Sequence, residues 1–199
     1  SNQAGRSNIL SRLEKYGVKI DSKDPKVQKI LDEVKDREFS GYSYDGADAS
    51  FELLANRLLG KVPEYLKVKS YNVSVAKSDT IKTKANVVFL IDGKNIECNG
   101  EGNGPVNALD NAIRSNFKKV EKYYNFFSDL KLLDYKVRIL NTGTEATTRV
   151  LIESTDKSGV SWFTVGVSPN IIEASFKALI DSLDYKLYKE KAPANLNEK

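Results

Sequence analysis

The segment best suited to ligand chemistry is a glycine-rich turn at residues 102–105, which reads Gly-Asn-Gly-Pro. Glycines let the backbone adopt positive φ and approach a ligand closely, and proline in a first helical turn leaves neighbouring N–H groups at the positive end of the helix dipole. Such a turn suits a carboxylate. The alternative is that a corner between a strand and a helix needs glycines, since no complete phosphate-loop or dinucleotide pattern is present. Ser168-Pro169 marks a second helix start of the same kind, for which an ordinary N-cap is the alternative.

Several kinds of catalytic chemistry are excluded by residues that the chain lacks. Histidine is absent from the 199 residues, and cysteine occurs once, at Cys98. The chain alone therefore has no Ser-His-Asp or Cys-His mechanism, no histidine metal ligand, no internal disulfide and no cysteine zinc cluster. No pair of carboxylates can be placed in one cleft, and the aromatic residues fall at spacings typical of core positions. We predict no catalytic residue and no metal site here, and a small apolar role for Cys98.

Composition indicates a globular chain with a mixed surface. Lys and Arg number 31 against 27 Asp and Glu, so the net charge of +4 is small and is spread along the sequence. This favours a solvated surface over a nucleic-acid partner. No apolar run approaches the roughly 18 to 20 residues of a membrane span, and no signal-like leader opens the chain. We expect a cytoplasmic protein without a membrane segment, and the lack of any methionine suggests a fragment of a longer polypeptide.

Helical spacing dominates the first part of the chain. Apolar residues recur every three or four positions in three short stretches within residues 1–62. Ser7 is a candidate N-cap for the first helix, Asp24 followed by Pro25 for the second, and the third is expected at about 48–59. Because so few residues form a weak core, this helical subdomain should pack on something larger.

From about residue 70 the apolar period changes from 3.6 to 2, which predicts strands. Three antiparallel strands, two of them joined by a hairpin turn at Asp92-Gly93, precede a helix expected to reach Val120. The same order recurs, so two βββα units are predicted at 69–121 and 132–188. Their helices align as a weak internal repeat, with Ala108 and Ala112 on Ala174 and Ala178.

These patterns predict an α+β fold. The helical linker subdomain (1–62) is followed by a domain at 68–190, in which each of two three-stranded antiparallel sheets is covered by its own helix, and by a flexible tail at 191–199. The second faces of the sheets, with Val88, Leu90 and Leu151, have no evident cover. We therefore expect a homodimer.

Five segments carry a resemblance to a known family: residues 5–10, 102–113, 133–138, 149–154 and 164–175. Together they resemble the C-terminal regulatory domain and adjoining helical subdomain of the 2-isopropylmalate synthase and citramalate synthase family. Their sequences are most similar to the (R)-citramalate synthase branch.

The resemblance implies a function for a larger protein. In this family an acyltransferase condenses acetyl-CoA with a 2-oxo acid, pyruvate in the citramalate branch, on a barrel that binds a divalent metal. The fragment would lack that barrel, hold no cofactor and be inactive alone. It would be the feedback sensor of branched-chain amino acid biosynthesis, binding isoleucine in this branch, or leucine in the isopropylmalate branch, at a dimer interface.

The resemblance also implies which residues bind the effector. An amino acid needs N–H donors for its carboxylate, an acceptor for its ammonium group and an apolar wall for its side chain. Carried over by position, the pocket would comprise Gly102, Asn103, Gly104, Val106, Asn107, Asp134 as a possible acceptor, Tyr135, Ile139 and Val167.

A double-stranded-RNA-binding module is the alternative from another class, because its order is also helix, three strands, helix. That fold places lysines at the start of its second helix to meet phosphates. Here the helix starts with Pro105-Val-Asn-Ala-Leu-Asp110, which has an acid and no cation. The sequence therefore disfavours RNA.

Overall fold

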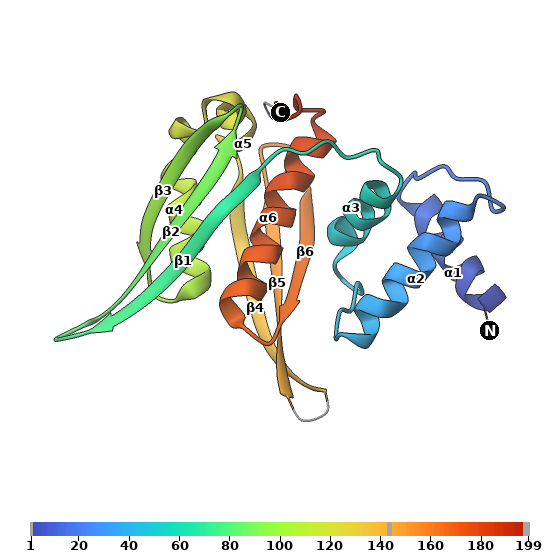
Figure 1. The fold of residues 1–199 in the computed structure, drawn as a ribbon, viewed down its shortest axis with the longest axis horizontal. Coiled ribbons are helices and arrows are strands. Elements are labelled where there is room, and N and C mark those ends of the chain that lie inside the picture. The colour runs from blue at the N-terminus through green and yellow to red at the C-terminus, as the bar shows by residue number, and fades with distance from the viewer. Residues whose placement is uncertain (1, 143–144, 197–199) are drawn as a thin grey trace.

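The computed structural model describes residues 2–142 and 145–196 (Figure 1). Three helices form a helical unit at one end, and two three-stranded sheets with their helices make up the rest. The helical unit consists of α1 (Asn2–Lys15), α2 (Pro25–Phe39) and α3 (Asp48–Leu58). The first sheet and its helix are β1 (Lys67–Lys77), β2 (Ile81–Ile91), β3 (Lys94–Gly102) and α4 (Pro105–Arg114). After two 3₁₀ turns and α5 (Tyr124–Phe127) come β4 (Lys131–Thr142), β5 (Glu145–Thr155), β6 (Ser161–Ser168) and α6 (Ile171–Lys189).

Both sheets are antiparallel with strand orders β1-β2-β3 and β4-β5-β6, which confirms the predicted α+β fold. The hairpin turn between β2 and β3 is also confirmed. Asp92 and Gly93 have φ of 51° and 77°, the left-handed values that a two-residue type I′ turn requires.

The helical unit forms largely as predicted. The Asp24 carboxylate accepts a hydrogen bond from the Lys26 N–H at 2.9 Å, and Pro25 opens α2. The N-cap assigned to Ser7 is wrong, because α1 begins at Asn2 and Ser7 lies inside it. The Arg6 guanidinium, one residue before Ser7, donates to the Gln28 side chain at 3.0 Å and so links this part of α1 to α2.

Two helix boundaries differ from the predictions. Helix α4 ends at Arg114 rather than near Val120, because the Asn116 side chain donates to the Ala112 carbonyl at 2.6 Å and to the Asn99 carbonyl at 3.0 Å. Side-chain bonds of this kind compete with the next helical turn. Helix α6 begins after Asn170, whose Oδ1 accepts from the Ile172 N–H at 2.8 Å, so the N-cap is Asn170 and not the Ser168-Pro169 pair.

The internal repeat has a packing reason. A Cβ on Gly100 would lie 2.6 Å from the Ala112 Cα, and a Cβ on Gly166 would overlap the Ala174 carbonyl oxygen. Gly100 and Gly166 each lie eight residues before the first alanine of their helix. Glycine on the strand and alanine on the helix thus let each helix backbone approach its sheet closely in both halves.

The two units share one core. Helices α4 and α6 contact each other between the inner faces of the two sheets, and buried residues from both sheets belong to one hydrophobic cluster. Tyr71 of β1 stacks on Phe176 of α6, with ring centroids 4.1 Å apart and planes 11° apart. Each helix therefore packs on its own sheet and also against the other unit.

The expectation that both second faces lack cover is wrong for the second sheet. Val165 and Val167 on the outer face of β6 belong to the core of the helical unit, and Leu151 packs against it. On the outer face of the first sheet Val88 and Leu90 are half-buried beside polar contacts such as that of Asn86 with Glu97.

The C-terminal segment is not the expected flexible tail over residues 191–196. Asn195 is 7% exposed, and its side chain donates to the Tyr65 and Leu90 carbonyls, both at 2.8 Å. The Tyr123 hydroxyl donates to the Pro193 carbonyl at 2.9 Å. The segment is thereby fixed against the β2–β3 turn and the chain before β1.

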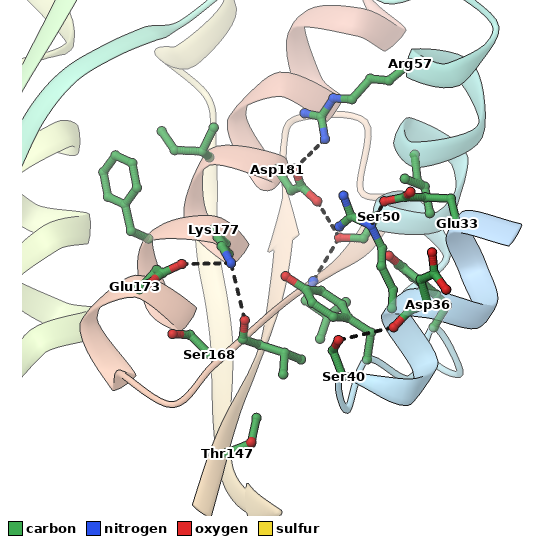
Figure 2. A pocket seen from close by; sticks show the side chains of 18 of the residues that line it. Glu33, Asp36, Ser40, Ser50, Arg57, Thr147, Ser168, Glu173, Lys177 and Asp181 are labelled. Carbon is green, nitrogen blue, oxygen red and sulfur yellow. Dashed lines mark hydrogen bonds and ion pairs between the residues drawn. The ribbon is translucent and has the colours of Figure 1, made fainter. Parts of the chain in front are cut away.

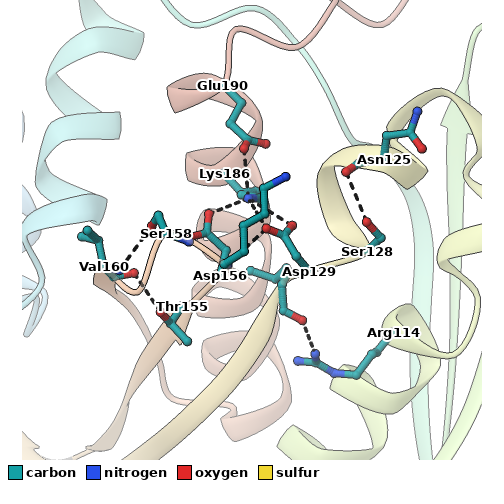
Figure 3. Close-up of polar contacts among 12 residues, drawn as sticks. Arg114, Asn125, Ser128, Asp129, Thr155, Asp156, Ser158, Val160, Lys186 and Glu190 are labelled. Atoms are coloured by element: carbon teal, nitrogen blue, oxygen red, sulfur yellow. Dashed lines mark hydrogen bonds and ion pairs between the residues drawn. The ribbon is translucent and has the colours of Figure 1, made fainter.

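A buried lysine ties three parts of the second unit together (Figure 3). The Lys186 side chain is 2% exposed and contacts Asp129 before β4, Asp156 after β5 and Glu190 at the end of α6. Burial disfavours both charged forms, but hydrogen bonds outweigh it, so the pKa of Lys186 is raised and that of Asp156 is lowered. This cluster is structural and fully paired.

Candidate functional site

The glycine turn leads into a helix whose first turn has no side-chain cap. Gly104 is the N-cap residue of α4 and supplies no side-chain cap. The Asn107 side chain accepts from the Asn103 N–H at 3.0 Å just before the helix, so that N–H is already paired. In the equivalent place on α6, Asn170 caps the N–H groups of Ile172 and Glu173. The start of α4 therefore retains the N–H groups and dipole that attract an anion.

The glycines of this turn act differently from the prediction. Positive φ was expected, but Gly104 has φ −172° and ψ −177°, extended backbone that any residue adopts, and a Cβ there would meet nothing within 4 Å. A Cβ on Gly102 would lie 2.5 Å from the Ala108 nitrogen. Gly102 thus serves the close approach of α4 to β3, whereas Gly104 leaves space above the helix start.

Strand β4 presents an exposed apolar stripe on the helix-covered side of its sheet. Tyr135 pairs with Ile152 of β5, and Val137 pairs with Val150, both of which are fully buried. Helix α6 packs on β5 and β6 and leaves β4 at the edge. The stripe comprises Tyr135, Val137 and Ile139, which are 44%, 41% and 71% exposed. Leu133, 52% exposed, lies at the irregularity in the β4–β5 register just before the stripe.

The repeat shows why this stripe is unusual. Strand register makes Tyr71 of β1 the equivalent of Tyr135. The row of paired residues that starts at Tyr71 ends at Cys98 of β3, and the row that starts at Tyr135 ends at Thr164 of β6. Tyr71 is covered by Phe176, but the helical position equivalent to Phe176 is Asp110 in α4. Among the residues that the structure describes, Tyr135 therefore has no corresponding aromatic cover.

The predicted effector residues fall in three places. Gly102, Asn103, Gly104, Val106 and Asn107 lie together at the start of α4. Tyr135 and Ile139 lie on the β4 stripe, and Asp134, opposite Glu153, faces the other side of that sheet. Val167 also lies on that other side, 4% exposed within the core of the helical unit. One protomer does not join these groups into a pocket, so the full residue set stays a prediction.

A cleft that the sequence did not indicate lies between the helical unit and the second unit (Figure 2). It has a volume of about 1170 Å³, and Val167 and Ser168 line it. Three ion pairs lie among its lining residues: Arg37 with Glu33 at 2.8 Å, Arg57 with Asp181 at 2.9 Å, and Lys177 with Glu173 at 2.9 Å. Because its walls come from segments more than 100 residues apart, no local pattern could have revealed it.

The comparisons identify the class of domain. The family described as the LeuA allosteric (dimerisation) domain matches residues 45–187, so the chain belongs to this family. The family resemblance inferred from the sequence is thereby confirmed. The match includes α3 as well as both βββα units.

Comparison with curated relatives shows which members of this family the chain is most similar to among those compared. The chain is 47% identical over 194 residues to the (R)-citramalate synthase of Geobacter sulfurreducens, covering 95% of this chain and 36% of that protein. It is 45% identical over 195 residues to the Aquifex aeolicus (R)-citramalate synthase, covering 96% and 36%. The 2-isopropylmalate synthase of Aquifex aeolicus is 30% identical over 184 residues, covering 91% and 32%. The chain thus spans about a third of these relatives and is more similar to the citramalate synthases.

Within the described ranges, no helix is long and apolar enough to cross a membrane. The same residues contain no group of three or more Cys, Asp or Glu side chains placed to hold a metal ion.

Proposed function

We propose that this chain is the feedback-regulatory part of a cytoplasmic (R)-citramalate synthase and that it binds a branched-chain amino acid, with isoleucine as the effector and leucine as the alternative. The single observation that carries the effector site is the uncapped start of α4 beside Gly104, in a family described as allosteric. Condensation of acetyl-CoA with pyruvate, and the divalent metal it uses, would belong to a barrel outside this chain. The chain alone would be inactive.

The chemistry of an amino acid suits the proposed site. Its carboxylate would accept from the first-turn N–H groups of α4, where the helix dipole favours a negative charge. Its branched side chain would lie on the apolar stripe at Tyr135 and Ile139. Asp134, the acceptor expected from the sequence for the ammonium group, faces the other side of β4, so it would have to be supplied by a second copy of the chain. Since these groups lie on separate elements of one protomer, the site would be completed where two copies meet.

Isothermal titration of the 199-residue chain tests this function. Isoleucine should bind more tightly than valine or leucine, and alanine, which lacks the branched side chain, should give no measurable heat. Tightest binding of leucine would favour the 2-isopropylmalate synthase alternative. Absence of heat with all three branched amino acids would contradict the proposed sensor.

We also propose that the chain forms a homodimer through the β4 stripe. Its apolar side chains are exposed in one protomer, and a second copy would remove them from water. Val137→Asp should shift the sedimenting species from dimer to monomer at micromolar concentration, because the new carboxylate would be buried without a partner. Phe39→Asp is the matched control, since Phe39 is 92% exposed at the end of α2. A wild-type monomer, or an intact Val137→Asp dimer, would count against this interface.

A further inference from the structure

Helix α3 packs on the second βββα unit through apolar side chains, and hydrogen bonds lie at the edge of this contact. Phe51 and Leu54 share the helical unit's core with Val165 on β6. At the edge of this contact, the Ser50 hydroxyl accepts from the Val165 N–H and donates to Asp181 of α6, both at 2.9 Å. The docking of α3 thus depends on residues of α6 as well as on β6.

Arg57 connects α3 to two carboxylates on α6. Its guanidinium contacts Asp181 Oδ1 at 2.9 Å and Asp184 Oδ2 at 2.8 Å (Figure 2 shows the Asp181 contact). Both oxygens of Asp181 are occupied, by Arg57 and by Ser50. Asp184 Oδ1 differs, because it is buried and has no hydrogen-bond partner among the described residues. Arg57 therefore pairs with two carboxylates, and in one of them, Asp184, only one of the two oxygens is hydrogen-bonded.

The surroundings of Asp184 oppose its negative charge. Arg57 on α3 is the facing cation, Asp181 on α6 and Glu64 before β1 add negative charge, and the phenols of Tyr65 and Tyr123 are within electrostatic reach. Burial is the largest effect and raises the pKa of Asp184 to about 7, although Arg57 acts to lower it. An ionised carboxylate with an unpaired buried oxygen costs more than a neutral carboxyl in the same place.

We propose that Asp184 makes the docking of α3 on α6 proton-dependent: the contact closes with uptake of one proton and loosens when that proton is lost. This inference does not rest on effector binding. When α3 separates from α6, Asp184 meets water and its pKa returns toward the ordinary 3.8, below the docked value of about 7. The docked state then binds more protons between these values, so the docking constant falls by up to tenfold per pH unit from about pH 4 to about pH 7 and is level above that.

Hydrogen–deuterium exchange of the 199-residue chain measures this opening. After correction for the intrinsic exchange rate, the open fraction of α3 should rise about tenfold between pH 5.5 and 6.5 and level off above pH 7. Asp184→Asn should flatten this profile and keep α3 at least as protected at pH 8 as in the wild type, because the amide cannot ionise. A wild-type profile without pH dependence, or an unchanged slope in Asp184→Asn, would overturn the proposal.

Two further variants test whether titration of Asp184 controls the docking of α3 or whether Asp184 only makes a structural contact. Asp181→Asn removes a neighbouring acid and should move the bend in the profile to lower pH, while Arg57→Gln removes the facing cation and should move it to higher pH. Amides of β2 serve as the internal reference in every sample, and they also reveal any variant that fails to fold. If β2 follows the same pH profile as α3, the proton is linked to global unfolding and the docking proposal fails.

Discussion

Gly166→Ala should destabilise the chain by about 3 kcal/mol or more, a large part of the stability of a typical domain. The new methyl group would overlap the Ala174 carbonyl oxygen and lie 2.9 Å from the Ala178 nitrogen. Both are backbone atoms of α6, so no side-chain rotation relieves the overlap. Helix α6 would have to move away from β5 and β6, which would open the core shared by the two units.

Urea unfolding, followed by far-UV circular dichroism, measures this effect, and Gly104→Ala is the matched control. At position 104 a Cβ meets nothing within 4 Å and φ is −172°, so the control should change stability by only a few tenths of a kcal/mol. Equal stability of Gly166→Ala and the wild type would show that α6 does not pack on β6 as closely as described.

Much of the fold could be predicted because local pattern and tertiary structure agree. The period-2 stretches, the Asp92-Gly93 turn and the Asp24-Pro25 helix start each use short-range chemistry that the final fold preserves. The paired alanines also indicated the repeat before its close packing was visible. Their partners, Gly100 and Gly166, explain why small residues recur on both the helix and the strand.

The structure differs from the sequence predictions where contacts between distant segments determine the local conformation. Helix α4 ends early because Asn116 reaches the carbonyl of Asn99 on β3, and residues 191–196 are ordered because Asn195 reaches Tyr65 and Leu90. The cover over Val167 comes from the helical unit, where Gly41 lies beside it more than 100 residues earlier in the chain. No local sequence pattern predicts these contacts.

The candidate site was predictable only in part for a similar reason. The turn at 102–107 is contiguous, so its residues necessarily lie together. Tyr135 and Ile139 share a face by strand alternation, but that face depends on a neighbour for its cover. Val167 was placed beside the second helix start in sequence, yet strand pairing puts it on the opposite side of the sheet from Tyr135.

Gly104→Val should abolish measurable isoleucine binding while leaving the fold intact. Gly104 is extended and not at positive φ, so the effect comes from the space that its missing side chain leaves open and not from backbone strain. A branched side chain above the first turn of α4 would exclude a carboxylate from the N–H groups there. Valine tolerates extended backbone, so circular dichroism and sedimentation should resemble those of the wild type.

Isothermal titration of variants with side chains of increasing size at position 104 tests whether the start of α4 binds the carboxylate. Gly104→Ala adds only a methyl group and should weaken isoleucine binding less than Gly104→Val, so affinity should fall with the size of the side chain. Tyr135→Ala removes part of the proposed apolar wall and should also weaken binding incompletely, more for isoleucine than for valine, because the larger side chain makes more contact with that wall. If Gly104→Val folds and binds isoleucine with unchanged affinity, the carboxylate is held elsewhere and the assignment of the α4 start fails, even though the chain still belongs to its family.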